Sequence, residues 1–279
     1  MSDADALIRL YKIFSNKHWN SKFGHETVFT NFSKLIENLQ PEQKKLIVEL
    51  TERYTWITEG EYPMLLNAIL EKIDKEKLNK IKRLILFPVF KPEHKDQTKS
   101  GNEMLYKFRA YRNLLDRIKD KQFVEIETYE KILSTELISE EGTEIFLLDD
   151  YLGSGETIKD TVTEILKNPL ITTKKISVLA IASQKNAADY LTSMAIDLYT
   201  DKIYTRGITD YYQNPEKYDN IRTMQAIEYK INDNKYPFGY EESEALITLM
   251  RTPDNTFPIF WKEHRKGGIH YPAPFTRNE

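Results

Sequence analysis

Apolar side chains recur at helical spacing through the first 80 residues. They form four groups: Leu7, Leu10, Tyr11 and Phe14; Val28, Phe32, Leu35 and Leu39; Leu46, Leu50 and Tyr54; Leu66, Ile69, Leu70 and Ile73. A repeat of three or four residues marks one buried face of a helix. Pro41 and Pro63 suit the first turns of the third and fourth helices. We predict an all-helical domain over residues 1–80, either for packing or for binding a partner.

The pattern changes near Lys80, where short apolar runs begin to alternate with amphipathic segments. The predicted strands cover residues 83–90, 123–127, 144–148, 176–183, 198–204 and 256–261. The predicted helices cover residues 103–119, 156–167, 186–194, 215–231 and 241–250. Such alternation is typical of a mostly parallel sheet with helices on both faces. We therefore predict an α/β domain over residues 81–279, with its ligand site beyond the carboxyl ends of the strands.

Composition narrows the class of protein. Of the 279 residues, 40% are hydrophobic and 12% aromatic, and 40 basic side chains face 43 acidic ones for a net charge of −3. A large core can form, whereas a general nucleic-acid coat or a disordered chain is disfavoured. The chain has no cysteine, which excludes disulfides and thiolate metal sites and fits a reducing cytoplasm. No apolar run approaches the length of a membrane span.

The segment that carries chemistry spans residues 145–158, with the sequence IFLLDDYLGSGETI. Four apolar residues lead into Asp149 and Asp150, and a small-residue loop then precedes a helix. Glycines allow the backbone to turn tightly, Ser154 and Thr157 supply hydroxyl groups, and the helix N-terminus attracts anions. We expect a cradle for a phosphate monoester. The two carboxylates can accept hydrogen bonds from ribose hydroxyls or help to hold Mg²⁺. An ordinary strand, turn and acid-capped helix is the alternative.

This segment resembles the phosphoribosyl-pyrophosphate (PRPP) signature of type I phosphoribosyltransferases, in which an acid pair precedes a loop rich in Ser, Thr and Gly. The resemblance implies that Asp149 and Asp150 are the catalytic, ribose-binding acids, with indirect contact to Mg²⁺. It implies that the 5′-phosphate loop is Gly153, Ser154, Gly155, Glu156 and Thr157. Three positions depart from the signature. Tyr151 replaces an aliphatic residue, Gly153 replaces the aspartate of purine-salvage members, and Glu156 brings a negative charge to the loop.

The same resemblance implies a diphosphate loop after the first strand of the sheet. The candidates are Lys99, Ser100 and Gly101, just before the predicted helix, with Arg109 and Arg112 on that helix. Lysine and arginine side chains can neutralise a departing diphosphate. A solvated, capped helix is the equally weighted alternative.

A second resemblance concerns the stretch 251–261, RTPDNTFPIFW, and the tail 272–277, PAPFTR. Both resemble the C-terminal part of phosphoribosyltransferase-like proteins encoded beside bacterial defence genes, including retron cassettes. This implies base-contacting or hood roles for Arg251 and Asn255. It also implies an effector role against phage, with the N-terminal helices meeting a defence partner such as a reverse transcriptase or nucleic acid. A structural edge strand with a proline-rich tail is the alternative.

Two interpretations of function follow. The first is a pentosyltransferase-type enzyme that binds Mg²⁺ with PRPP or a nucleotide and makes or breaks an N-glycosidic bond. The second is a non-catalytic module of the same fold that senses a nucleotide or binds a partner. A flavodoxin-like or other phosphosugar-binding fold is a third. The sequence favours no particular acceptor base or oligomeric state.

Overall fold

Five of the apolar runs form one parallel sheet in the computed structural model, which describes residues 1–94, 100–231 and 235–277. The strand order is β3-β2-β4-β5-β6, and every neighbouring pair is parallel. The strands are β2 (Arg83–Pro88), β3 (Gln122–Glu125), β4 (Thr143–Leu152), β5 (Ile176–Gln184) and β6 (Asp197–Tyr204). The predicted α/β class is confirmed.

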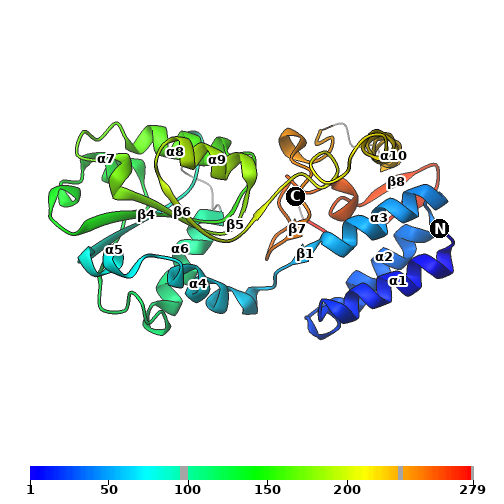
Figure 1. Ribbon diagram of the computed structural model, residues 1–279, viewed down its shortest axis with the longest axis horizontal. Helices are drawn as coiled ribbons and strands as arrows, with labels where there is room; N and C mark the ends of the chain where they lie inside the picture. Colours follow the sequence, from blue (N-terminus) through cyan, green and yellow to red (C-terminus); the bar gives the residue numbers. More distant parts are fainter. Residues whose placement is uncertain (95–99, 232–234, 278–279) are drawn as a thin grey trace. The chain divides into compact units, whose positions relative to one another are not determined.

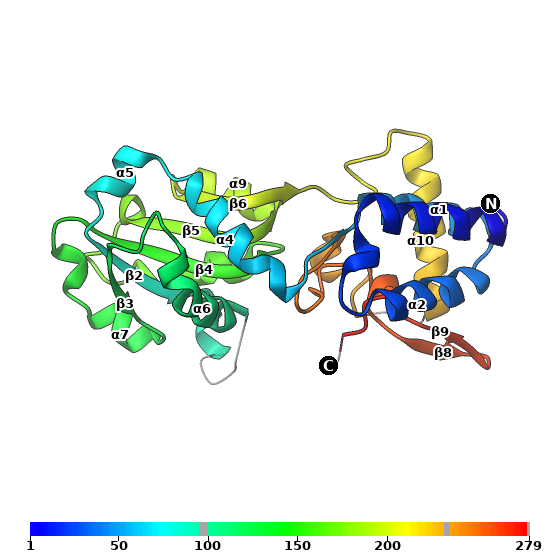
Figure 2. The ribbon, with the colours of Figure 1, turned by 90° about the horizontal axis from the view of Figure 1, so that it is seen from below.

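Helices cover both faces of this sheet. In Figure 1, α4, α5 and α6 lie on one face and α7, α8 and α9 on the other; Figure 2 gives the view from below. Their bounds are α4 (Tyr62–Glu71), α5 (Lys75–Lys80), α6 (Ser100–Tyr111), α7 (Tyr129–Ser134), α8 (Glu156–Ile165) and α9 (Lys185–Ser193). Short 3₁₀ helices span Pro92–His94, Arg112–Leu114, Leu137–Ser139 and Thr173–Lys175. Every residue of β4 and β5 is buried, as a strand covered on both faces requires.

The amino-terminal edge of the sheet is held by a lysine from α5. The Lys77 ammonium lies 2.9 Å from Glu144 of β4 and 2.8 Å from Asp197 of β6. It also donates to Ser177 of β5 at 2.9 Å. These contacts raise the pKa of Lys77, because hydrogen bonds and charge from Asp197 and Glu144 outweigh its desolvation. The Lys77 side chain thus contacts residues near the starts of three strands, β4, β5 and β6.

The chain packs as two compact units, Gly60–Tyr204 and a second made of Met1–Glu59 with Thr205–Glu279. We call the first the sheet unit and the second the helical unit. The predicted domain boundary near residue 80 differs from this division, because α4 packs on β5 and β6 of the sheet. The helical unit is assembled from both ends of the chain, coloured blue at the start and yellow to red at the end in Figure 1.

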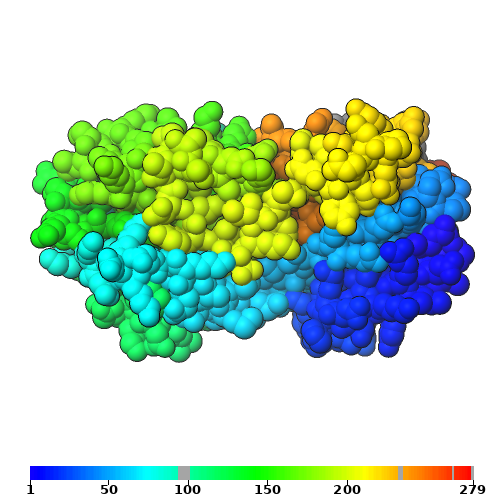
Figure 3. Space-filling model, viewed as in Figure 1, coloured from blue at the N-terminus to red at the C-terminus, as the bar shows by residue number. Residues whose placement is uncertain are grey.

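The helical unit contains the first three predicted helices, α1 (Asp3–Asn16), α2 (His25–Glu37) and α3 (Pro41–Arg53), and the later α10 (Glu216–Ile231). Figure 3 shows α10 (yellow) against α3 (light blue). Its short strands are β1 (Thr55–Trp56), β7 (Ile247–Thr248), β8 (His264–Lys266) and β9 (Ile269–Tyr271). Its 3₁₀ helices are Trp19–Ser21, Tyr240–Glu242 and Pro258–Phe260, while Glu59–Glu61 joins the two units in sequence.

An aromatic cluster fills the core of the helical unit and joins its two chain segments. The Phe275 ring stacks on Tyr54, with centroids 5.0 Å apart and planes 2° from parallel. Edge-to-face contacts link Phe275 to Trp19, Phe32 and Trp56. The tail 272–277 therefore belongs to the core of the N-terminal helices. Tyr11, which we predicted on the buried face of α1, is 69% exposed instead, and Ala6 and Ile13 are buried beside Leu10.

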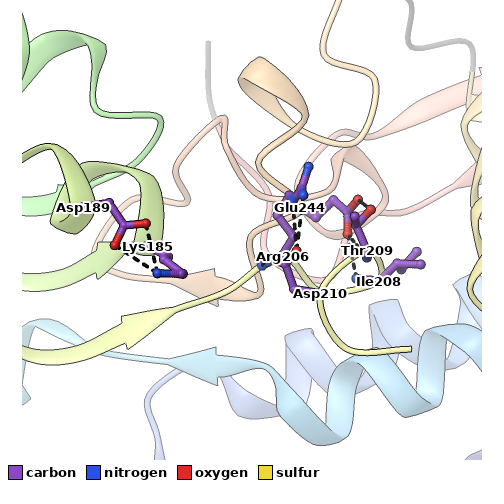
Figure 4. Close-up of polar contacts among 7 residues, drawn as sticks. All are labelled: Lys185, Asp189, Arg206, Ile208, Thr209, Asp210 and Glu244. Atoms are coloured by element: carbon purple, nitrogen blue, oxygen red, sulfur yellow. Dashed lines mark hydrogen bonds and ion pairs between the residues drawn. The ribbon is translucent and has the colours of Figure 1, made fainter. Parts of the chain in front are cut away.

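Two predicted elements in the C-terminal part are wrong. Residues 241–250 do not form a helix, since Glu241, Glu242 and Glu244 have φ of 55°, 49° and 48°. The Glu244 carboxylate is buried and accepts the backbone N–H groups of Ile208 (2.6 Å) and Thr209 (2.7 Å), as Figure 4 shows. This side-chain contact holds a left-handed backbone that periodicity alone does not reveal. Residues 256–261 form a 3₁₀ turn at Pro258–Phe260 instead of a strand.

Candidate active site

The sheet topology defines where a ligand site should lie. β2 and β4 are neighbours, yet the chain leaves β2 toward α6 on one face and leaves β4 toward α8 on the other. Ligands of open parallel sheets bind beyond the carboxyl ends of the strands at such a switch point. The candidate residues after β2 and after β4 therefore begin at the same edge of the sheet.

The loop after β4 has the geometry that the sequence predicts. Gly155 has φ +94°, and a Cβ there would lie 3.2 Å from Cα of Ala187 in α9. Glycine is therefore required both by the backbone and by the packing of α8 on α9. α8 begins at Glu156, and the Ser154 hydroxyl accepts the Glu156 N–H at 3.4 Å. The turn brings the N-terminal amides of α8 to the edge where β4 ends.

The helix after β2 packs tightly against the same edge. A Cβ on Gly101 would lie 2.7 Å from the Val89 nitrogen and oxygen and 3.0 Å from the Leu148 oxygen. Only glycine permits the first turn of α6 to approach the ends of β2 and β4 so closely. Of the other loop candidates, Ser100 is the first residue of α6, and Lys99 lies outside the described residues.

The two aspartates lie inside β4, which extends to Leu152 where we predicted a strand ending at residue 148. Both are buried, with 5% of Asp149 and 8% of Asp150 exposed. Because side chains alternate along a strand, the two carboxylates are directed to opposite faces of the sheet. Asp149 Oδ1 accepts the backbone N–H of Asp150 at 2.9 Å, and Asp150 Oδ2 accepts the Tyr62 hydroxyl at 3.2 Å. The two carboxylates are therefore held by different hydrogen bonds.

The Glu156 carboxylate, which departs from the PRPP signature, is paired with a lysine that the sequence analysis did not identify. Lys91 follows β2, and its ammonium lies 2.8 Å from the Glu156 carboxylate at the start of α8. A hydrogen bond with Glu156 raises the pKa of Lys91. The ion pair links the segments that leave β2 and β4. It offsets the negative charge that Glu156 brings to the loop after β4.

The structure places both arginine candidates toward the edge strand β3. Arg109 contacts the Glu125 carboxylate and lies 3.1 Å from Glu127, and these partners raise its pKa. It sits in the last turn of α6, roughly 12 Å along the helix axis from Gly101. The Arg112 guanidinium lies over the Phe123 ring at 4.4 Å. Neither side chain is gathered with the loop residues at the start of α6.

Arg251 and Asn255, the base-contacting candidates, belong to the helical unit. Asn255 is buried, and its amide donates to Ser243 Oγ at 2.9 Å and to the Tyr240 carbonyl at 3.3 Å. This amide joins two turns of the unit, so a structural role is evident. Arg251 is exposed.

The described residues include neither a membrane-spanning helix nor a cluster of metal-binding side chains. Over residues 1–94, 100–231 and 235–277, no helix is long and apolar enough to cross a membrane. Within the same ranges, His, Asp and Glu side chains nowhere gather in threes in a metal-binding arrangement.

The parallel sheet, its switch point and the loop after β4 define a phosphoribosyltransferase-like protein. The sequence model of the PRTase-CE family matches residues 29–277, and the chain belongs to that family. This confirms the resemblance to type I phosphoribosyltransferases, and the match spans segments of both units.

Comparison with other proteins adds two distant structural similarities. Orotate phosphoribosyltransferase from Aeropyrum pernix is 14% identical, with a TM-score of 0.32 over 52% of this chain and 72% of that protein. A hypothetical protein from Neisseria gonorrhoeae, solved with bound ppGpp, is 13% identical, with a TM-score of 0.34 over 62% of this chain and 97% of that protein. No curated protein matches the sequence.

Proposed function

We propose that the chain binds PRPP or a nucleotide through its 5′-phosphate and acts at the anomeric carbon of the ribose. The observation that carries the proposal is the turn at Gly155, where a left-handed glycine delivers the α8 amides to the carboxyl edge of the sheet beside two buried acids. Ser154, Gly155 and Thr157 would hold the phosphate. Asp149 and Asp150, which are directed to opposite faces of the sheet, would each accept a hydrogen bond from a different ribose hydroxyl.

In the reaction, the bond between the anomeric carbon and its leaving group would lengthen first, and positive charge would develop on the ribose. An acceptor would then form the new bond to the anomeric carbon: the nitrogen of a base when PRPP is the donor, or water or diphosphate when a nucleotide is. The leaving group is diphosphate for PRPP or the base for a nucleotide. The buried carboxylates would stabilise that charge electrostatically while the phosphate loop holds the ribose in place. The carboxylate oxygens of either aspartate fit Mg²⁺, which proteins bind through one or two carboxylates together with substrate phosphates. Because Asp149 and Asp150 are directed to opposite faces of the sheet, one of them alone would hold the ion. When bound, Mg²⁺ supplies charge neutralisation to the diphosphate.

A calorimetric titration with PRPP, with and without Mg²⁺, tests this proposal. We expect micromolar binding that depends on Mg²⁺ and is lost in the Asp149→Asn/Asp150→Asn variant. Asp197→Asn, which alters an acid at the amino-terminal edge of the same sheet, is the matched control and should bind normally. A folded protein that binds neither PRPP nor a nucleotide 5′-phosphate would overturn the proposal, whereas PRPP binding leads to the next assay. Release of pyrophosphate in the presence of candidate bases would then identify the acceptor.

A second candidate function, a nucleotide-sensing module without transfer activity, is favoured by the arginines. Arg109 is paired with Glu125 and Glu127, and Arg112 lies over the Phe123 ring. These contacts hold both cations toward β3, so neither is placed to neutralise a departing diphosphate. Under this alternative PRPP or a nucleotide binds but no pyrophosphate is released. An anti-phage effector role, proposed from the sequence resemblance of residues 251–261 and 272–277, predicts that the Asp149→Asn/Asp150→Asn variant loses protection in a phage plating assay.

A further inference from the structure

Tyr62 brings a hydroxyl group to the acid pair from outside the strands of the sheet. It is the first residue of α4, it is 1% exposed, and its hydroxyl donates to Asp150 Oδ2 at 3.2 Å. The two residues are 88 positions apart in the sequence. The fold of the sheet unit, and not local sequence, creates this contact.

A buried lysine accompanies the tyrosine. Lys107 of α6 is 6% exposed, and its ammonium lies 5.0 Å from the centre of the Tyr62 ring. A cation over an aromatic face is attracted by the ring, more strongly when both are shielded from water. A buried charge is costly unless opposite charge or hydrogen bonds compensate it. α4, α6 and β4 therefore contribute one buried polar cluster that contains a cation, a phenol and a carboxylate.

The two aspartates are oriented by different means. Asp149 is held by the backbone N–H of its own neighbour, so strand geometry fixes it. Asp150 is directed to the face of the sheet that α4 and α6 cover, where the Tyr62 hydroxyl contacts one of its oxygens. That hydrogen bond restricts rotation of the Asp150 carboxylate.

We propose that Tyr62 is a positioning residue that orients Asp150 toward a ribose hydroxyl of the ligand, with Lys107 supporting the tyrosine ring. The inference rests on the proposed function, because it assigns recognition of the ribose to Asp150. It adds a specific consequence. The tyrosine contributes to the recognition of the sugar and contributes nothing to the recognition of the phosphate.

The test compares two phosphate monoesters, one with a ribose ring and one without. Ribose 5-phosphate and glycerol 3-phosphate are titrated calorimetrically into the full chain and into Tyr62→Phe. We expect the variant to bind ribose 5-phosphate about tenfold more weakly, the scale of one hydrogen bond to a charged group. Its affinity for glycerol 3-phosphate should stay within about twofold, because the phosphate loop is unchanged.

Tyr199→Phe is the matched control. The Tyr199 hydroxyl donates to Asp197 at 3.3 Å, which is an exposed tyrosine–aspartate bond at the amino-terminal edge of the sheet. Its removal should change neither affinity. In the Asp150→Ala background, which removes the acceptor, Tyr62→Phe should have no further effect on ribose 5-phosphate, because a residue that acts through Asp150 is silent without it.

The outcomes separate this inference from the function on which it rests. If the unaltered chain binds neither PRPP nor ribose 5-phosphate, the proposed function fails and the inference fails with it. If the unaltered chain binds both and Tyr62→Phe binds ribose 5-phosphate equally well, the inference alone is overturned. Equal weakening for both monoesters also overturns it, since that result indicates a general structural role. Should Tyr62→Phe not fold, Lys107→Met provides the same selectivity measurement, with an expected loss of about threefold for ribose 5-phosphate only.

Discussion

The two edges of the parallel sheet use charged side chains in opposite ways. At the amino-terminal edge, Lys77 contacts Glu144, Ser177 and Asp197 and joins the starts of three strands. At the carboxyl edge, two buried aspartates are held separately, and the neighbouring turns contain glycines that allow backbone to approach closely. The first arrangement satisfies its charges internally and stabilises the fold. The second places the acids and the helix amides at the edge of the sheet where we propose that the ligand binds.

The largest effect should come from breaking the amino-terminal network. Lys77→Met leaves the buried Glu144 carboxylate without its cation, so we expect the free energy of unfolding to fall by about 3 kcal/mol. Urea denaturation measures this. Lys185→Met is the control, because the Lys185–Asp189 pair in Figure 4 is exposed and should contribute little. A loss of similar size in both variants would contradict the distinction between a structural network and a surface ion pair.

Gly155→Ala should affect both stability and ligand binding. The residue has φ +94° and its new Cβ would meet α9, so we expect a loss of about 1–2 kcal/mol in the free energy of unfolding. PRPP binding should weaken as well, because the α8 amides shift. Gly24→Ala, at φ +79° with open space around it, tests backbone strain alone. Equal PRPP affinity in the unaltered chain and in Gly155→Ala would argue against the phosphate loop.

Glu156→Gln should strengthen PRPP binding about threefold, since it removes a negative charge near the phosphate and releases Lys91 from its ion pair. Lys91→Met should weaken binding by a similar factor. Calorimetry at low and high salt measures both effects, which should shrink as salt screens the charges. Glu164→Gln, at the far end of α8 and paired with Lys167, is the control. Weaker binding by Glu156→Gln would show that this carboxylate assists the ligand.

The smallest effect concerns pH. The hydrogen bond from Lys77 lowers the pKa of Asp197 below its ordinary value of 3.8. Its contribution to stability is therefore present above pH 3.8 and is lost as the pH falls through the lowered pKa. Because Asp197 is largely exposed, we expect less than about 1 kcal/mol. Urea titrations between pH 2 and pH 6 should show a smaller acid-induced loss in Asp197→Asn than in the unaltered chain.

Much of the sheet unit was predictable from sequence because its signals are local. Apolar runs predicted all five strands, and the loop around Gly155 was predicted from small residues that precede an amphipathic helix. Lys91 and Tyr62 were not found, because each acquires its role through a partner distant in sequence, Glu156 and Asp150. The prediction of a helix over residues 241–250 is wrong for a related reason. Its periodicity fits a helix, but the buried Glu244 carboxylate binds the backbone of Ile208 and Thr209 and stabilises a left-handed conformation.

The discontinuous helical unit has a consequence for how the protein is made. Tyr54 and Phe275 stack on each other in its core, but in the sequence the entire sheet unit lies between them. During synthesis the first three helices leave the ribosome long before the segment that completes their core. The sheet unit is one continuous stretch of chain, so it can fold before the C-terminal segment of the helical unit has been synthesised. Until the tail 272–277 arrives, Trp19, Phe32 and Trp56 lack their contacts with the Phe275 ring. During that interval the faces of these rings that Phe275 later covers stay open to solvent, which makes the unfinished unit prone to association.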